Sequence, residues 1–211
     1  HCPVRCPCGE RLMLAEKIRA ANASGAVTPV PRAIAVGFAG SPQLRAYSWG
    51  ASGFRGSYLA PATIPSNTPN GLAFSPDDTS IAVAHATSPF VSAYPWSASG
   101  FGSKYANPGT LPAGNGNGIA FSPDGANIAI SHVTTPFISV YTWSSASGFG
   151  SKYANPATLP TGTGNGVAFS PSGASIAVAH LTSPYITAYP WSGSGFGTKY
   201  ANPATLPTGT G

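Results

Sequence analysis

Hydrophobic positions in this chain fall into short runs separated by turn residues, and the same runs recur along most of its length. In the last copy, "GVAFS" puts Val167 and Phe169 on one face and Ala168 on the other, which is the alternation of a β-strand. The following run, "SIAVAH" (175–180), is apolar on both faces, so it predicts a strand covered on both sides. After a Ser-Pro turn, "YITAYPW" (185–191) predicts a third strand.

The rest of each copy completes a four-stranded unit. Between the first two strands lie "SPDD", "SPDG" or "SPSG", whose residues favour tight turns. A Gly/Ser loop follows the third strand and leads to "TKYANPATLP" (198–207), which predicts a more polar fourth strand. Pro203 interrupts this strand, and proline suits an outer edge because it has no N–H to donate to the ladder.

These units repeat with a period of 47 or 48 residues, and a degenerate copy at 34–49 aligns with 176–191. The first strand of that copy is predicted at 26–30. Because one unit cannot bury both faces of its strands, neighbouring units must stack on each other. The pattern therefore predicts an all-β fold, a β-propeller of four-stranded antiparallel blades. The predicted parts are a leader at 1–24 and blades at about 25–69, 70–116, 117–164 and 165–211.

The segments "AFSPDD", "AFSPDG" and "AFSPSG", each followed by an "IAVA"-like strand, resemble the inner strands of WD40-like and YVTN-type β-propellers. The resemblance covers about 25–211. The third strands end in "AYPW", "VYTW" or "AYSW" rather than Trp-Asp, and no Gly-His precedes the first strand. The hydrogen-bonded tetrad of WD40 blades and its partner sites are therefore not carried over. The near-identical copies also resemble repeat-rich propellers of bacteriophage structural proteins, which implies a virion or extracellular setting.

Closure of the ring has three alternatives, because closed propellers have roughly four to eight blades. Further blades follow in a longer chain, two chains pair into a ring of eight blades, or four blades close alone.

The leader differs from the repeats. Residues 10–23 predict a helix, with Leu14, Ile18 and Ala21 on one stripe and a stop signal at Ser24-Gly25.

All the cysteines of the chain lie in this leader, at Cys2, Cys6 and Cys8. With His1 they offer four soft ligands to zinc, although their spacing is not that of a zinc knuckle. An odd number of cysteines also fits one disulfide plus a thiol that bridges to another chain. Unpaired thiols are the third alternative.

Three sets of aromatic or imidazole side chains recur at equivalent positions and are the candidate binding residues. The first is a set of histidines at the end of the second strands, predicted either to form a binding rim or to bond the following Thr/Ser-Pro turn: His85, His132 and His180. The second closes the third strands, predicted either to stack on sugars or a partner or to pack between blades: Trp96, Trp143 and Trp191. The third is an outer strip beside lysines, predicted either to be a lateral contact surface or to protect a sheet edge: Tyr105, Tyr153 and Tyr200.

The Asn-Gly pairs that open the units have a structural interpretation and a functional one. The asparagines either tolerate a positive φ in a turn or point at the mouth of the central channel. They are Asn70, Asn117 and Asn165.

Charge and hydrophobicity along the chain argue against several classes of function. Charged residues are 7% of the chain, and the net charge of +5 lies before residue 70, so the repeats carry no basic face for nucleic acid. No apolar run has the length of a membrane span. The acidic residues lie in the leader or in the turns between first and second strands, away from a central channel. The acidic residues are Glu10, Glu16, Asp77, Asp78 and Asp124.

The sequence therefore predicts a structural or binding propeller that is not an enzyme and uses no cofactor. Its expected partners are other protein subunits, including copies of itself, or surface glycans, and repeated weak contacts add avidity. A glycan-binding propeller is the first alternative. A lactonase- or hydrolase-like propeller enzyme, with its site in blades beyond this sequence, is the second.

Overall fold

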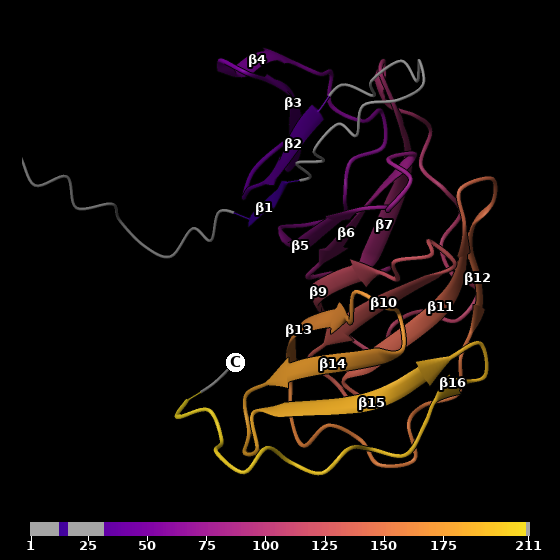
Figure 1. Cartoon of the computed structure of the whole chain (residues 1–211). Coiled ribbons are helices and arrows are strands. Elements are labelled where there is room, and N and C mark those ends of the chain that lie inside the picture. Colours follow the sequence, from indigo (N-terminus) through magenta and orange to yellow (C-terminus); the bar gives the residue numbers. More distant parts are fainter. Residues whose placement is uncertain (1–12, 17–31, 210–211) are drawn as a thin grey trace, which may run out of the picture.

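The computed structural model of this chain describes residues 13–16 and 32–209, and these form four antiparallel sheets of four strands each. Each sheet runs in sequence order from its first strand to its fourth (Figure 1).

The four sheets are the blades of the fold. Blade 1 consists of β1 (Met13–Glu16), β2 (Arg32–Gly37), β3 (Leu44–Gly50) and β4 (Gly53–Ser57). Blade 2 consists of β5 (Pro69–Phe74), β6 (Ser80–His85), β7 (Val91–Ser97) and β8 (Gly100–Phe101). Blade 3 consists of β9 (Gly116–Phe121), β10 (Asn127–His132), β11 (Ile138–Ser144) and β12 (Gly148–Lys152). Blade 4 consists of β13 (Gly164–Phe169), β14 (Ser175–His180), β15 (Ile186–Ser192) and β16 (Gly195–Phe196). The predicted all-β propeller of four-stranded blades is confirmed.

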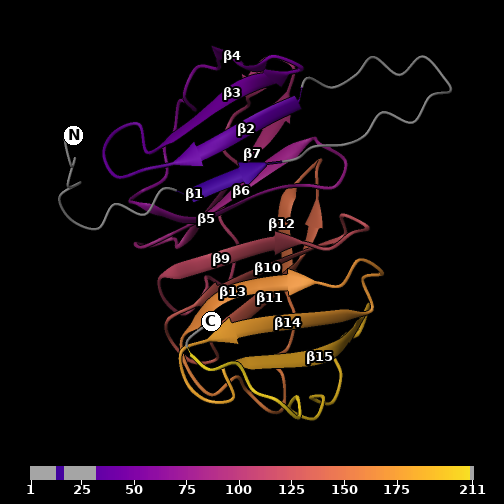
Figure 2. The same ribbon diagram turned by 60° about the vertical axis from the view of Figure 1, so that its left-hand side comes forward.

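The sheets follow one another along an arc, with blade 1 at one end and blade 4 at the other (Figures 1 and 2). The first strands of successive blades, β1, β5, β9 and β13, lie against each other on the inner side of the arc. In the described residues the four blades form an open arc. The three alternatives for closure of the ring stay predictions.

The predicted leader helix is wrong where the structure describes it. Met13–Glu16 forms strand β1, whose residues pair antiparallel with β2 from Met13↔Gly37 to Glu16↔Ile34. The inner edge of β2 carries N–H and C=O groups that need partners, and pairing them outweighs a weak helical stripe. β1 is the first strand of blade 1, the position that was predicted for residues 26–30. Residues 26–30 and the three cysteines lie outside the described residues.

The predicted fourth strand at 198–207 is also wrong. The fourth strand of the last blade is β16, which is two residues long and directly follows the Gly/Ser loop. Beyond it the described chain keeps two hydrogen bonds to β15, each of 2.9 Å, from Gly197 N to Pro190 O and from Tyr200 N to Ala188 O. The prolines at 203 and 207 have no N–H for a longer ladder, so the segment runs on without regular structure.

The Asn-Gly pairs lie inside the first strands and not in turns, so the predicted positive φ at asparagine is wrong. Asn70 Nδ2 donates to the carbonyl oxygen of Gly116 at 2.9 Å, which ties blade 2 to blade 3. The glycine that follows allows the close approach, because a Cβ added at Gly71 would lie 2.8 Å from the carbonyl oxygen of Asn117. Asn117 makes the same bond to Gly164 in blade 4.

Each blade has two different apolar faces, and these meet at every blade junction. The trailing face, which turns toward the next blade, carries small side chains; in blade 2 these are Ala82, Ala84, Val91 and Ala93. The leading face, which turns toward the preceding blade, carries large ones; in blade 3 these are Ile128, Ile130, Tyr141 and Trp143. Small residues opposite large ones let the sheets approach and interdigitate. The same pairing joins blade 1 to blade 2 and blade 3 to blade 4.

Candidate functional site: the blade junction and its uncovered copies

At each junction a tyrosine of one blade is inserted against a tryptophan of the next. The ring centroids of Tyr105 and Trp143 are 5.2 Å apart with an interplanar angle of 83°, an edge-to-face contact. The ring of Tyr58 meets Trp96 in the same way at 4.9 Å, and that of Tyr153 meets Trp191 at 4.9 Å.

A glycine in the loop after the third strand makes room for this tyrosine. Gly148 has a φ of +83°, and a Cβ added there would lie 2.9 Å from Cβ of Tyr105. Gly100 and Gly195 stand in the same relation to Tyr58 and Tyr153. We call the tyrosine the knob and the Trp–Gly–Phe pocket that receives it the slot. In blade 3 the slot is formed by Trp143, Gly148 and Phe149.

The junction is repeated three times, but blade 4 has no blade on its trailing face in the structure. Its small residues are half-buried, whereas their equivalents in blade 2 are fully buried, such as Ala84 and Ala93 at 0% exposure. The residues of the uncovered trailing face are Ala177, Ala179, Ile186 and Ala188. The knob beside them, Tyr200, is 46% exposed, while Tyr105 and Tyr153 are half-buried.

Blade 1 has the opposite half of the junction uncovered. Its slot is formed by Trp49 and Phe54, whose centroids are 4.9 Å apart at 88°, the same contact as in the other blades. Phe54 is 62% exposed, and the described atoms nearest to a Cβ at Gly53 belong to Trp49 of the same blade, at 3.9 Å. Val36 and Tyr47 of its leading face are half-buried, although their equivalents Val83 and Tyr94 are fully buried.

The three recurring histidines are fully buried. His85 Nδ1 contacts the Thr87 carbonyl oxygen at 2.9 Å, and its Nε2 contacts Ser92 Oγ at 3.0 Å. Burial lowers the pKa of His85 to about 4, so the ring is neutral at physiological pH. These contacts are those of the structural alternative, in which the histidine bonds the Thr-Ser-Pro turn.

The other two histidines make the same Nε2 contact to the third strand. His132 Nε2 contacts Ser139 Oγ at 3.0 Å, and His180 Nε2 contacts Thr187 Oγ1 at 2.9 Å. Burial lowers the pKa of His132 to about 4 and also lowers that of His180. A role of the three histidines in binding a partner stays a prediction.

The recurring tryptophans lie inside the junctions, with exposures of 5% to 7%. These contacts are those of the packing alternative, and a role of the three tryptophans in binding a sugar or a partner stays a prediction. Of the tyrosine strip predicted at the outer edge, only Tyr200 is exposed. Sequence reasoning missed the small residues of the trailing face, although the apolar character of both faces of 175–180 indicated that something covers them.

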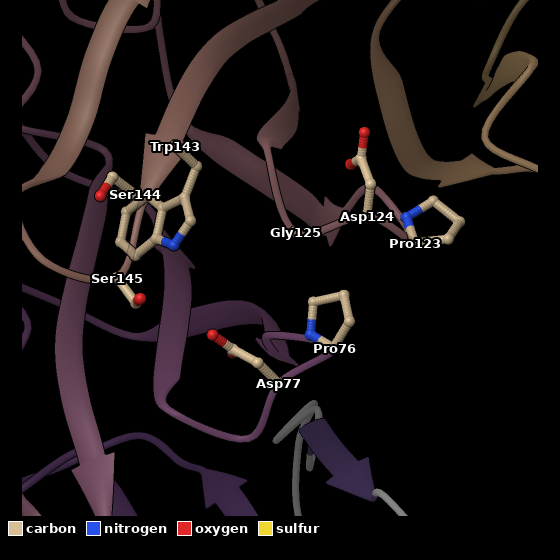
Figure 3. A pocket seen from close by; sticks show the side chains of 8 residues that line it. All are labelled: Pro76, Asp77, Pro123, Asp124, Gly125, Trp143, Ser144 and Ser145. Carbon is tan, nitrogen blue, oxygen red and sulfur yellow. The ribbon is translucent and has the colours of Figure 1, made fainter.

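One open pocket of about 550 Å³ lies where the turns of blades 2 and 3 come together (Figure 3). Figure 3 shows Asp77 and Asp124 on neighbouring turns, with the Asp77 carboxylate directed toward Ser145 and Trp143 and the Asp124 carboxylate directed away from them. The pocket is also lined by Pro76, Pro123 and Gly125.

Both carboxylates of this pocket are held by their own turns. The Asp77 carboxylate accepts hydrogen bonds from Ser75 Oγ and Thr79 Oγ1, the latter at 2.7 Å. Burial acts to raise the pKa of Asp77, but these hydrogen bonds outweigh it and lower the pKa. A hydrogen bond from Ser122 Oγ lowers the pKa of Asp124. The two acids are thus ionised turn residues, able to attract a basic side chain.

In the described part of the chain, no three His, Cys, Asp or Glu side chains gather as metal ligands. Within the same residues, no helix has the length and hydrophobicity of a membrane span.

Solved structures share this fold at low sequence identity. A proposed 6-phosphogluconolactonase from Bacteroides uniformis matches with a TM-score of 0.64 and 18% identity, over 78% of this chain and 48% of its own. A second proposed 6-phosphogluconolactonase, from Bacteroides fragilis, has a TM-score of 0.63 and 16% identity, over 79% of this chain and 50% of its own. The hydrazine synthase of Kuenenia stuttgartiensis has a TM-score of 0.58 and 13% identity, over 87% of this chain and 52% of its own.

These similarities define the class of the protein by its fold alone, a β-propeller. The chain spans about half the length of the solved structures that it matches. No protein-family model matches the sequence, and no curated protein is similar to it. The resemblances to WD40 repeats and to bacteriophage propellers stay predictions.

Proposed function

We propose that this chain is a non-enzymatic structural propeller that assembles with other protein subunits through the uncovered trailing face of blade 4. One observation carries the proposal. The face that is fully buried in blade 2 is half-buried in blade 4, with the knob Tyr200 exposed beside it. Contiguous exposed apolar surface of this kind marks interaction sites. On the resemblance to bacteriophage propellers, the proposed setting is a virion or a cell exterior.

The Ala188→Arg variant tests this proposal. Ala188 is half-buried in the centre of the uncovered face, and its equivalents Ala93 and Val140 are buried at every junction. Arginine there places an unpaired charge in the contact, so we expect the dissociation constant of the assembly to rise about 100-fold, which is roughly 3 kcal/mol. Sedimentation velocity over a range of protein concentrations measures it.

Ser192→Arg is the matched control for this variant. Ser192 ends the same strand and is exposed, as are its equivalents Ser97 and Ser144 in blades that have a neighbour. The control variant should assemble like the unmodified chain. A chain that sediments as a monomer at every concentration, or an Ala188→Arg variant that assembles normally, contradicts the proposal.

A second candidate function rests on the names of two matched structures, both proposed 6-phosphogluconolactonases. It is hydrolysis of a sugar lactone. We expect no acceleration of 6-phosphogluconolactone hydrolysis over the buffer rate when the purified chain is added. Turnover that survives further purification and scales with the amount of chain favours this second candidate.

A further inference from the structure

We propose that the partner at the trailing face of blade 4 is blade 1 of a second copy of this chain, so that two chains join head to tail into one ring of eight blades. This inference rests on the proposed function and names its partner.

The two ends of the arc carry the two halves of one contact. At the end of blade 4, the knob Tyr200 and the small residues around Ala188 are uncovered. At the end of blade 1, the slot of Trp49, Gly53 and Phe54 has no knob from another blade in the described residues. Placing the knob in the slot would reproduce a contact that the chain already makes three times, with ring centroids 4.9 to 5.2 Å apart.

The slot of blade 1 is already formed before any partner arrives. Trp49 and Phe54 hold the same edge-to-face geometry as Trp143 and Phe149, at 4.9 Å and 5.1 Å between centroids. The φ of Gly53 is +92°, which matches the +83° of Gly148, so the loop has the conformation that admits a tyrosine. A preformed site lowers the ordering cost of association.

Head-to-tail contact is favoured over contact between two copies of blade 4 by the shapes of the faces. A trailing face presents small side chains, and a leading face presents Ile, Val, Tyr and Trp. Two trailing faces placed together would leave voids between alanines, whereas a trailing face on a leading face fills the space as it does within the chain. A heterologous contact of this kind closes into a ring when its rotation allows, and eight blades lie within the range of known propellers.

One residue of blade 1 departs from the other leading faces. Arg45 is exposed at the position that holds the buried hydroxyls of Ser92, Ser139 and Thr187. Its long side chain must stay solvated at the rim of the contact, which weakens the junction between chains relative to those within one. We therefore expect Arg45→Ser to tighten the association several-fold.

Complementation of two one-sided variants tests the arrangement. Ala188→Arg blocks the trailing face of blade 4, and Val36→Arg blocks the leading face of blade 1, where the equivalent Val83 is fully buried. Each variant alone should lose the dimer, because both junctions of its ring contain the arginine and each junction is weakened about 100-fold. A mixture of the two should recover a species of two chains, because each retains the face that the other lacks. Circular dichroism of each variant shows that it is folded, and a variant that is not is replaced by Tyr200→Ala or Phe54→Ser, which change exposed residues of the same two faces.

The outcomes separate the two proposals. If assembly is lost in Ala188→Arg but kept in Val36→Arg, blade 4 contacts something other than blade 1, and the head-to-tail inference is overturned while the proposed function stands. Open polymers of many chains would likewise overturn the ring. If the unmodified chain never assembles, the proposed function fails as well.

Discussion

Acidification from pH 6.5 to about 4 is expected to lower the free energy of unfolding by about 3 kcal/mol for each of His85 and His132. Burial disfavours the charged imidazole and lowers the pKa of both side chains from the usual 6.5 to about 4, and the positive charges of Lys104 and Lys152 act in the same direction. The unfolded chain therefore binds more protons than the folded one in this range. The stability that these histidines contribute is complete above pH 6.5 and is lost as the pH falls toward 4.

Urea unfolding at a series of pH values measures this loss, and His132→Gln tests its origin. We expect the free energy of unfolding of the variant to fall less steeply with decreasing pH, because glutamine does not titrate and the proton taken up by His132 on unfolding is missing. Ser139→Ala is the matched control, since it removes the hydrogen bond to His132 Nε2 and keeps the imidazole. The control should be less stable at neutral pH but should keep the steep acid dependence. Equal slopes for His132→Gln and the unmodified chain would contradict the assignment.

The carboxylates do not account for a loss in this range. The pKa values of Asp77 and Asp124 are lowered below the usual 3.8 by hydrogen bonds within their turns. Their contribution to stability is therefore present above pH 3.8 and is lost only at lower pH. Of the groups with shifted pKa values in the described residues, the buried histidines and not these two carboxylates account for acid sensitivity near pH 5.

Replacing Trp143 by alanine is expected to lower the free energy of unfolding by about 4 kcal/mol. The ring is 7% exposed and makes edge-to-face contacts with Tyr105 of the preceding blade and with Phe121 and Phe149 of its own. Its Nε1 has no hydrogen-bond partner in the described part of the chain, so the loss is one of packing. Chemical unfolding followed by far-ultraviolet circular dichroism measures it.

The matched control for this variant is Trp49→Ala. Trp49 occupies the same position in blade 1 but is only half-buried, and Phe54 and its own blade supply its ring contact. Trp49→Ala should therefore lower the free energy of unfolding of a monomer by only about 1 kcal/mol. Removal of this half-buried ring uncovers surface, whereas removal of the buried Trp143 ring leaves a cavity. Both variants are compared in the Ala188→Arg background so that association does not contribute. Equal losses for the two tryptophans would contradict the packing argument.

Much of the fold was predictable from local pattern. Runs such as "GVAFS" alternate with the period of a β-strand, and turn residues lie between them. A few consecutive residues are enough to determine both features. The period of 47 or 48 residues then required neighbouring units, since "SIAVAH" at 175–180 has two apolar faces. The elements predicted wrongly are those whose partners are distant. Strand β1 forms at Met13–Glu16 because β2 has an edge to be paired, and a helical stripe is a weaker preference than a backbone ladder.

The candidate site was predictable only in part. The recurrence of His132, Trp143 and Tyr105 marked them as structurally equivalent positions, but equivalence in the repeat does not tell whether a side chain faces solvent or another blade. What the sequence determined by itself is the blade, because strand period and turn residues are local properties. What only the tertiary structure decided is which copies are covered. Ala93 and Ala188 occupy equivalent positions, yet one is buried and the other is open, because burial depends on whether another sheet lies against that face.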